Sequence, residues 1–512
     1  MQRRPLDAQR LPLHLRRLSN ANGPFRKIRW LIEAISLSGG NWLFLADVNP
    51  LIPAPSWLDS GDTAWQLTAA TFVGLQSLPG LAILYGGLVK KKWALNSTVM
   101  CFYAFAAVLV VWMLWGYNMA FGAPALIPGP AFLQATVGIP HPAMGPEFEI
   151  GQSTIPLAAG GLPDLHFPGS AMIFFQFVFA AITPLLIAGS VLGRMNFKAW
   201  MVFVPVWSSI VYSVGAFMIW GGGWVSQLGA VDYSGGYVIH LAAGVSGFVA
   251  AAVVGPRLLE DRQDFEPNNL IMAFAGAGIL WLGWNGFNGG DPYFANADAA
   301  AAVLNTNIAT AVALLAWLIL DMWAIGKPNG VSMINGMITG LVGITPAAGY
   351  VDGWGAVAIG LGAGIIAWLS LNKLGQLPIL KRVDDTLGVL HTHGVAGLIG
   401  GLMVGLVANP NMIEYLSTDK TGKVSAVSVS GLFYGGGFAQ LSHQAVAALV
   451  IIVFDAVMTF VILKLIGLVI PLRASSPEME GGDLAIHGVD PMPVYIPTPG
   501  IRPPSVGGAP AG

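Results

Sequence analysis

Apolar residues run in long segments along this chain, and short polar segments separate them. From Asp62 onward the apolar runs reach about 20 residues, the length at which a helix crosses a bilayer. The pattern predicts eleven spans, at residues 63–88, 95–121, 169–192, 199–222, 235–255, 268–288, 301–324, 331–350, 354–372, 387–408 and 442–468. We therefore expect an all-α membrane protein. Its parts are a basic N-terminal segment at residues 1–60, a transmembrane domain at 61–468 and a polar tail at 469–512.

One polar motif occurs twice inside these apolar runs. His240 lies in the fifth predicted span and His393 in the tenth, and an Asp precedes each by eight residues (Asp232 and Asp385). An ionisable side chain inside a bilayer costs about 2.5–3.5 kcal/mol or more, so each histidine is a functional candidate. Five spans per half place the two halves in opposite orientation. The repeat predicts an inverted five-plus-five arrangement with a closing helix, and histidines that meet near the membrane midplane.

The chemistry of two facing imidazoles suits a small neutral solute. Two neutral rings share one N–H···N bond, while their outer nitrogens remain free to donate or accept. Such a pair can also relay a proton by exchanging tautomers. The alternative is two separate buried histidines, each bonded to a backbone carbonyl, and the repeated motif favours the pair. For Asp232 and Asp385, capping of a helix start is favoured over binding of a substrate.

Basic residues indicate the orientation of the chain in the membrane. Lys and Arg cluster in the loops after odd-numbered spans, which predicts an N-terminus outside and a C-terminus inside. We expect the protein in the inner (plasma) membrane. The basic residues of segment 1–60 would resist export. That segment is a cleaved signal, an amphipathic extension or an untranslated leader, and the sequence leaves these alternatives open.

Composition excludes several other classes of protein. Charged residues make up 10% of the chain, against about 25% in soluble domains. The net charge of −2 argues against a nucleic-acid partner. The single cysteine, Cys101, excludes an intramolecular disulfide and a thiolate metal cluster. Because the spans hold no Cys or carboxylate co-ligands at helical spacing, we expect no metal, no cofactor and no enzymatic activity.

These motifs resemble the ammonium transporter (Amt/Mep/Rh) family, over the chain from Asp62 to about Asp490. The first-span stretch that begins Leu78-Pro-Gly-Leu, the pattern Asp232-x-x-Gly-Gly-x-x-x-His240 and His393-Gly-x-x-Gly are similar to the family's signatures in helices one, five and ten. An extra histidine, His391, and Asp291, where the family often has Ser, resemble its plant-type second-class subgroup. Residues two apart on a helix face different ways, so we do not expect His391 to line the pore.

The resemblance implies a homotrimer with one pore per subunit. It implies an outer vestibule that recruits ammonium, a phenylalanine gate, a pore-lining Trp and a substrate path or proton relay along two histidines, with two Asp residues supporting deprotonation. The residues at these positions are Trp220 and Asp291 (vestibule), Phe179 and Phe287 (gate), Trp284 (pore lining), His240 and His393 (path), and Asp232 and Asp385 (support). It also implies a PII-type signalling partner at the inner face.

We therefore expect an ammonium transporter or channel in which ammonium loses its proton near the gate and ammonia passes the histidines. The proton either follows through the imidazoles or stays behind. The alternative is an ammonium sensor with little transport, and the short polar tail argues against an autonomous signalling domain.

Overall fold

The computed structural model describes residues 54–125, 135–154, 165–263, 266–418 and 424–490. The predicted N-terminal segment and the end of the tail, from residue 491, lie almost wholly outside these ranges. The unit that begins at Trp57 consists mainly of long apolar helices. Within the described residues, ten continuous helices are long and apolar enough to cross a membrane, and α17 is a shorter apolar helix.

The bounds of the long helices agree with most of the predicted spans. They are α3 (Ser60–Leu75) with α4 (Leu81–Leu88), α5 (Ala94–Val111) with α6 (Tyr117–Phe121), α9 (Gly169–Val191), α10 (Phe197–Trp207) with α11 (Ser213–Ile219), α13 (Ala242–Val254), α15 (Leu270–Gly289), α16 (Ala297–Ile325), α17 (Gly330–Ile344), α18 (Gly353–Asn372), α20 (Ala396–Val407) and α21 (Ala439–Gly467). Five π-helical turns extend or join them, at Gln76–Gly80, Trp112–Gly116, Ser208–Tyr212, Gly236–Leu241 and Leu390–Val395.

Short elements occupy the two ends of the helices. They are α8 (Pro146–Glu149), α12 (Trp224–Gln227), α14 (Leu259–Gln263), α19 (Pro378–Lys381), α22 (Ser476–Gly481) and α23 (Asp483–His487), with 3-10 turns at Lys91–Trp93, Leu374–Gln376 and Leu432–Tyr434. Strands β1 (Glu414–Thr418) and β2 (Val424–Ser428) form an antiparallel hairpin between α20 and α21. Only helices were predicted from the sequence, so this hairpin differs from the prediction. It lies outside the long helices.

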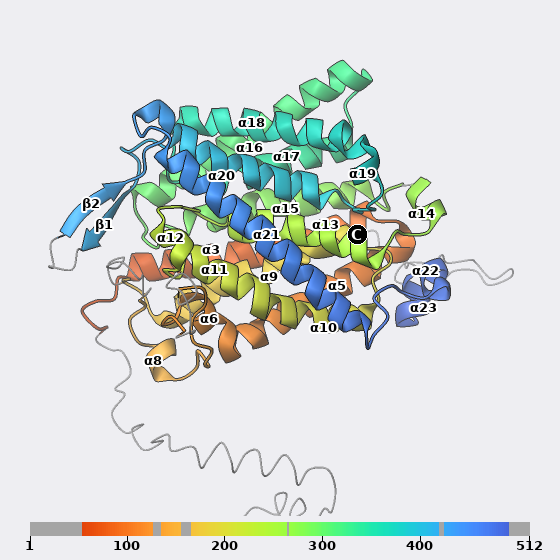
Figure 1. Ribbon diagram of the computed structural model, residues 1–512, viewed down its shortest axis with the longest axis horizontal. Coiled ribbons are helices and arrows are strands. Elements are labelled where there is room, and N and C mark those ends of the chain that lie inside the picture. Colours follow the sequence, from red (N-terminus) through yellow and green to blue (C-terminus); the bar gives the residue numbers. More distant parts are fainter. Residues whose placement is uncertain (1–53, 126–134, 155–164, 264–265, 419–423, 491–512) are drawn as a thin grey trace, which may run out of the picture. The chain divides into compact units, whose positions relative to one another are not determined.

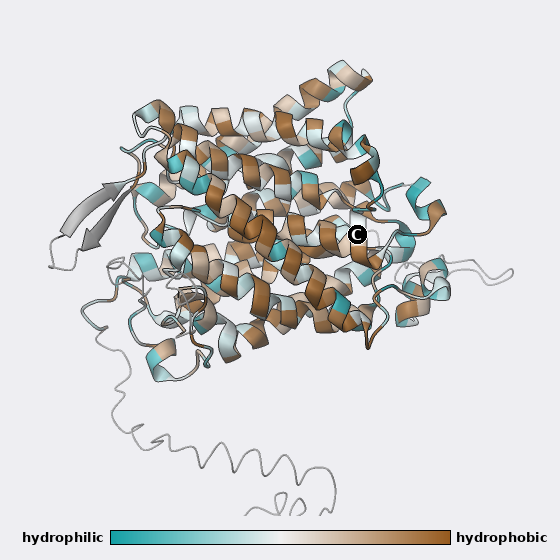
Figure 2. Cartoon of the chain, in the orientation of Figure 1, coloured by the Kyte–Doolittle hydropathy of each residue, from teal (hydrophilic) through white to brown (hydrophobic). Residues whose placement is uncertain are grey.

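Figure 1 shows β1, β2, α8 and α12 at one end of the helices and α14, α19, α22 and α23 at the other. Hydrophobic residues dominate the middle of the helices, while hydrophilic residues are concentrated at the two ends (Figure 2). This distribution suits a bilayer, whose hydrocarbon core would surround the middle of the helices. Each helix also satisfies its backbone hydrogen bonds internally, without water.

Side-chain caps explain where many helices begin. A side-chain oxygen of the residue before the helix accepts a hydrogen bond from a backbone N–H of the first turn, which would otherwise have no partner. These caps are Asp59 for α3, Asn196 for α10, Asn269 for α15, Asn296 for α16, Asn329 for α17 and Asp352 for α18.

The predicted span 331–350 is too long. Helix α17 has 15 residues and ends at Ile344, two residues before Pro346. Proline has no N–H to donate to the carbonyl oxygen four residues earlier, so the α-helical hydrogen-bond pattern stops there. The turn is still buried, and the carbonyl of Pro346 accepts a hydrogen bond from the backbone N–H of Tyr233 at 3.2 Å.

Glycines allow the fifth and tenth helical segments to cross in close contact. A Cβ added to Gly244 would lie 2.4 Å from the backbone N of Gly394 and 3.4 Å from the carbonyl oxygen of Val389. A Cβ added to Gly397 would lie 3.2 Å from the backbone N of Leu241 and 2.5 Å from the carbonyl oxygen of Gly236. Each contact of one glycine thus has its counterpart 153 residues away along the chain, the same spacing as the two histidines.

The neighbours of these two segments follow the same repeat. A Cβ on Gly247 would meet Ser190 of α9 at 2.4 Å, and a Cβ on Gly400 would meet Gly343 of α17 at 2.0 Å. Span five therefore packs on span three, and span ten packs on the eighth predicted span. The reciprocal contacts have the pattern of a twofold relation, in which the same patch occurs on both sides of an interface.

We predict that Gly244→Ala lowers the stability of the purified protein by about 1–3 kcal/mol, because the added methyl group would force the two segments apart. Thermal unfolding in detergent measures the effect. Gly278→Ala in α15 is the matched control, because a Cβ there meets nothing within 4 Å. Equal melting temperatures for the two variants would contradict the close crossing.

Candidate functional site

Two π turns carry the repeated histidines. The first, Gly236–Leu241, follows Gly235 at φ 103°, and the Asp232 carboxylate accepts hydrogen bonds from the backbone N–H groups of Gly235 (3.2 Å), Tyr237 (2.9 Å) and Val238 (3.0 Å). In the second, Leu390–Val395, the Asp385 carboxylate accepts from the backbone N–H of Leu390 at 2.9 Å. Both aspartates thus bond the first turn of the segment that holds a histidine. π turns are rare and frequently mark functional sites.

The imidazoles of His240 and His393 contact one another. Their Nδ1 atoms are 3.2 Å apart, and the ring centroids lie 5.4 Å apart at an angle of 22°. His240 is fully buried and His393 is 5% exposed. One Nδ1 donates and the other accepts, so at least one Nδ1 is deprotonated. Among the described residues, Nε2 of His240 has no hydrogen-bond partner. It is therefore free to bond a small solute.

An aromatic column leads from this pair toward one end of the helices. The Trp284 ring lies nearly parallel to His240, with centroids 5.2 Å apart, and Phe287 lies 4.8 Å from Trp284. Phe179 and Phe287 are 4.4 Å apart, and Trp220 meets Phe179 edge-on at 6.3 Å. Trp220 is half-buried, whereas both phenylalanines are fully buried. The four Trp and Phe positions predicted from the sequence thus form one contiguous series that ends at His240.

Hydrogen bonds that no motif marks hold this column in place. Trp284 donates from Nε1 to Thr345 Oγ1 at 2.8 Å, and Trp220 donates from Nε1 to the carbonyl oxygen of Asp232 at 2.7 Å. Ser234 donates from Oγ to the carbonyl oxygen of Phe287 at 2.8 Å. Thr345 lies in the turn after α17 and was missed, because the sequence shows no pattern that links it to Trp284.

Asp291 lies in the loop after α15 and is half-buried, and its Oδ2 is buried without a partner among the described residues. It does not cap the next helix, because Asn296 does so. Burial and the nearby Asp232 carboxylate raise the pKa of Asp291, and a hydrogen bond from Ser234 opposes them. Burial also raises the pKa of Asp232 to about 6, against the backbone hydrogen bonds that lower it. Two acidic side chains therefore lie close together beside the aromatic column.

His391 contacts a different part of the protein from His393. Its Nδ1 lies 2.8 Å from Ser370 Oγ on α18, and its ring is 7% exposed. The prediction that His391 and His393 face different directions agrees with these contacts.

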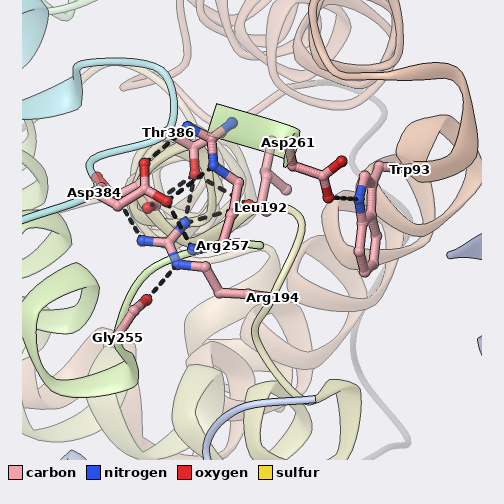
Figure 3. A network of polar contacts seen from close by, with 9 residues as sticks. Trp93, Leu192, Arg194, Gly255, Arg257, Asp261, Asp384 and Thr386 are labelled. Atoms are coloured by element: carbon pink, nitrogen blue, oxygen red, sulfur yellow. Dashed lines mark hydrogen bonds and ion pairs between the residues drawn. The ribbon is translucent and has the colours of Figure 1, made fainter. Parts of the chain in front are cut away.

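A network of hydrogen bonds around Arg194 and Arg257 lies at the same end of the helices as α14 and α19 (Figure 3). Arg194 is fully buried and donates to the carbonyl oxygen of Asp384, the carbonyl oxygen of Gly255 (2.7 Å) and Thr386 Oγ1. Arg257 donates to the Asp384 carboxylate from Nε (3.0 Å) and Nη2 (2.7 Å). These bonds join the ends of α9 and α13 to the loop before the second histidine. From the sequence, these arginines were used only to predict the orientation of the chain in the membrane, and their hydrogen bonds were not predicted.

The chain is a multi-pass helical membrane protein with two contacting histidines beneath a column of aromatic rings. The profile of the Ammonium Transporter Family matches residues 64–491. The chain belongs to this family.

Its relatives cover nearly the whole helical region. Ammonium transporter 2 of Arabidopsis thaliana is 50% identical over 448 residues, which is 86% of this chain and 90% of that protein. Ammonium transporter 3 member 3 of Oryza sativa subsp. japonica is 48% identical over 453 residues, 86% of this chain and 91% of that protein. The crystal structure of Saccharomyces cerevisiae Mep2 has a TM-score of 0.69 at 28% identity, over 82% of this chain and 89% of that chain. Membership of the family, predicted from the motifs, is confirmed.

We predict that Asp384→Asn lowers the stability of the protein at pH 7 by about 1–2 kcal/mol, since it removes the charge that Arg257 binds. Burial raises the pKa of Asp384, but hydrogen bonds and charge from Arg257 outweigh it and hold this pKa below its usual value. A depressed carboxylate pKa stabilises the fold above the unfolded value of about 3.9 and ceases to do so as the pH falls through the folded value.

The difference in unfolding free energy between wild type and Asp384→Asn should therefore disappear in acid. The control is Glu260→Gln, an exposed carboxylate at the same end of the helices. A pH-independent difference would show that the charge of Asp384 is not responsible.

Proposed function

We propose that this protein transports ammonium across the plasma membrane through the passage that the aromatic column and the two histidines line. The observation that carries the proposal is the 3.2 Å contact between two buried imidazoles directly beneath a stacked pair of phenylalanine rings. Fixed charge at such a site would trap a cation, whereas neutral imidazoles offer hydrogen bonds to ammonia without holding it.

The cation is first bound at Trp220. A Trp face attracts a cation by about 0.5–2 kcal/mol, and it holds no fixed counter-charge that would prevent release. The carbonyl oxygen of Asp232 accepts the Trp220 N–H, and Asp291 lies close enough to Asp232 for their charges to interact. An ionised Asp291 would add attraction for ammonium.

One N–H bond of ammonium then breaks near Phe179, because the buried phenylalanine pair cannot solvate a charge. The proton either stays on water at the Trp220 side or follows through the imidazoles. Ammonia, which is neutral and small, passes Phe287 and bonds to Nε2 of His240 and then to His393. Trp284 keeps the His240 ring in place by stacking, and Asp232 and Asp385 fix the turns that carry the two histidines.

The arrangement of the chain in the membrane is part of the proposal. Helix α17 and the buried turn up to Tyr350 together make an eleventh crossing, and the reciprocal glycine contacts support an inverted repeat of five plus five helices. One pore per subunit and a trimer follow from the family resemblance. A PII-type signalling protein at the inner face stays a prediction from that resemblance.

The location of the basic side chains supports a C-terminus on the cytoplasmic side of the membrane. Loops after the first, third, fifth and ninth spans meet at one end, where Lys90 and Lys92 pair with Asp261 at 3.4 and 3.1 Å and Arg257 pairs with Asp384. The tail helix α23 lies at this end too, since Asp483 accepts hydrogen bonds from the backbone N–H groups of Leu95 and Asn96, both at 2.8 Å. Basic residues at one end mark the cytoplasmic side.

An ammonium pulse on proteoliposomes, recorded by solid-supported-membrane electrophysiology with ammonium uptake measured in parallel, tests transport. We expect uptake in the wild type and a change of at least about tenfold in His240→Ala and His393→Ala, because each loses one half of the imidazole contact; tenfold corresponds to about 1.4 kcal/mol. A current indicates that the proton follows through the imidazoles, and uptake without current indicates that it stays behind. If the wild type shows no uptake and no current, the proposal is contradicted and a sensor is favoured.

A second prediction concerns the vestibule. Asp291→Ser should weaken the apparent affinity for ammonium severalfold, because it removes an acidic group close to Asp232, whose backbone carbonyl binds Trp220. The matched control is Asp298→Asn, on the first turn of α16. An unchanged affinity in Asp291→Ser would show that the carboxylate does not act on the cation.

A further inference from the structure

A cavity of about 470 Å³ lies at the end of the helices opposite to Trp220, beside the arginine network. We call it the Asp385 cavity. Its lining includes Arg257, Asn335, Lys381, Asp385, Gly388 and His391. Three residues of this lining, Leu387, Gly388 and His391, lie just before or within the π turn that holds His393. The cavity therefore ends within about one helical turn of the imidazole contact.

His391 is held so that its imidazole lies along the wall of this cavity. Nδ1 lies 2.8 Å from Ser370 Oγ, and a Cβ added to Gly375, another lining residue, would lie 3.2 Å from Nε2. A serine hydroxyl both donates and accepts hydrogen bonds, so Ser370 keeps this bond whether the imidazole is neutral or protonated. The position 153 residues earlier holds Val238, so the first half of the repeat has no counterpart of His391.

Asp385 lines the same cavity as His391. Its Oδ2 accepts from the backbone N–H of Leu390, while its Oδ1 is buried and has no hydrogen-bond partner among the described residues. Burial favours the neutral form of an imidazole, and a nearby carboxylate favours the protonated one, so both forms of His391 are set by its position in this wall. The other charged groups of the lining are Arg257 and Arg262 from the segment after α13, Lys381 from α19 and Asp384, which Arg257 binds. The lining residues from α17 and α18 are uncharged.

We propose that His391, positioned by Ser370 and facing the Asp385 cavity, is a proton-exchange residue that returns a proton to ammonia as it leaves the His240–His393 contact. This inference rests on the proposed function and adds to it a named acid at the exit. The cavity then holds ammonium beside the Asp385 carboxylate before the ion enters the solution.

The step balances with protons from the aqueous solution at this end. The N–H bond at Nε2 of protonated His391 breaks, a fourth N–H bond forms on ammonia, and ammonium departs. The neutral imidazole then takes a proton from water in the cavity. Movement in the opposite direction reverses each transfer, so the same group accepts a proton from entering ammonium.

The first test measures ammonium flux through the full-length protein in proteoliposomes of a single orientation, checked by protease access to the C-terminal tail. The pH on the tail side is varied from about 5 to 8, the range in which an imidazole titrates. We expect His391→Gln to reduce flux severalfold and to flatten its dependence on tail-side pH, while the dependence on the opposite pH is unchanged. Ser370→Ala should shift the pH profile without flattening it.

His443→Gln is the matched control, since this histidine lies on α21 at the opposite end, where a Cβ on Gly229 would approach its ring to 2.9 Å. A tail-side pH profile of His391→Gln that equals that of the wild type would overturn the proposal. Loss of flux in every protein, wild type included, would instead contradict the proposed function.

A second test does not depend on transport. In ¹⁵N-histidine-labelled protein, the signals that disappear in His391→Gln belong to this ring. We expect them to titrate between about pH 5 and 8 and to move when ammonium chloride, but not sodium chloride, is added. Signals that stay constant over this range would overturn the proposal, whatever the flux measurements show.

Discussion

The close crossing of two glycine-rich helical segments is the contact on which the remaining structure depends. Gly244 and Gly397 leave no room for a side chain between the segments, so their backbones approach until His240 and His393 touch. In a membrane this approach has a direct physical basis. Lipid chains are as apolar as leucine, so helices associate through close packing and polar contacts and not through the hydrophobic effect. The imidazole contact is the polar part of the same interface.

The two ends of this crossing are built differently, although the crossing itself is reciprocal. At one end the aromatic rings of Trp220, Phe179 and Phe287 cover the histidines, with two acidic side chains beside them. At the other end a cavity reaches the segment of His393, and Arg194 and Arg257 hold Asp384 and Thr386 of its wall in place. Two different ends suit the proposed process, in which a cation gives up its proton on one side and regains it on the other.

The long helices and the pairing of the two histidines could be predicted from the sequence, because the patterns that indicate them are local. Apolar runs located the long helices, and the repeat of Asp232 and His240 in Asp385 and His393 predicted that equivalent positions would meet. Other features depend on contacts between distant segments. Thr345 bonds Trp284 across 61 residues, and Arg194 bonds the loop at Asp384 across 190, so neither partner leaves a mark near the other in the sequence. The length of α17 was overestimated from the sequence, because its apolar run continues past Pro346 into a buried turn.

The most direct test of the account is an experimental structure of the protein in a lipid bilayer, determined with ammonium present and at a resolution that shows side chains. The account predicts Nδ1 atoms of His240 and His393 within hydrogen-bond distance, under contacting rings of Phe179 and Phe287. Imidazoles that are separated, or that are packed against lipid-facing neighbours with no passage between them, would contradict it.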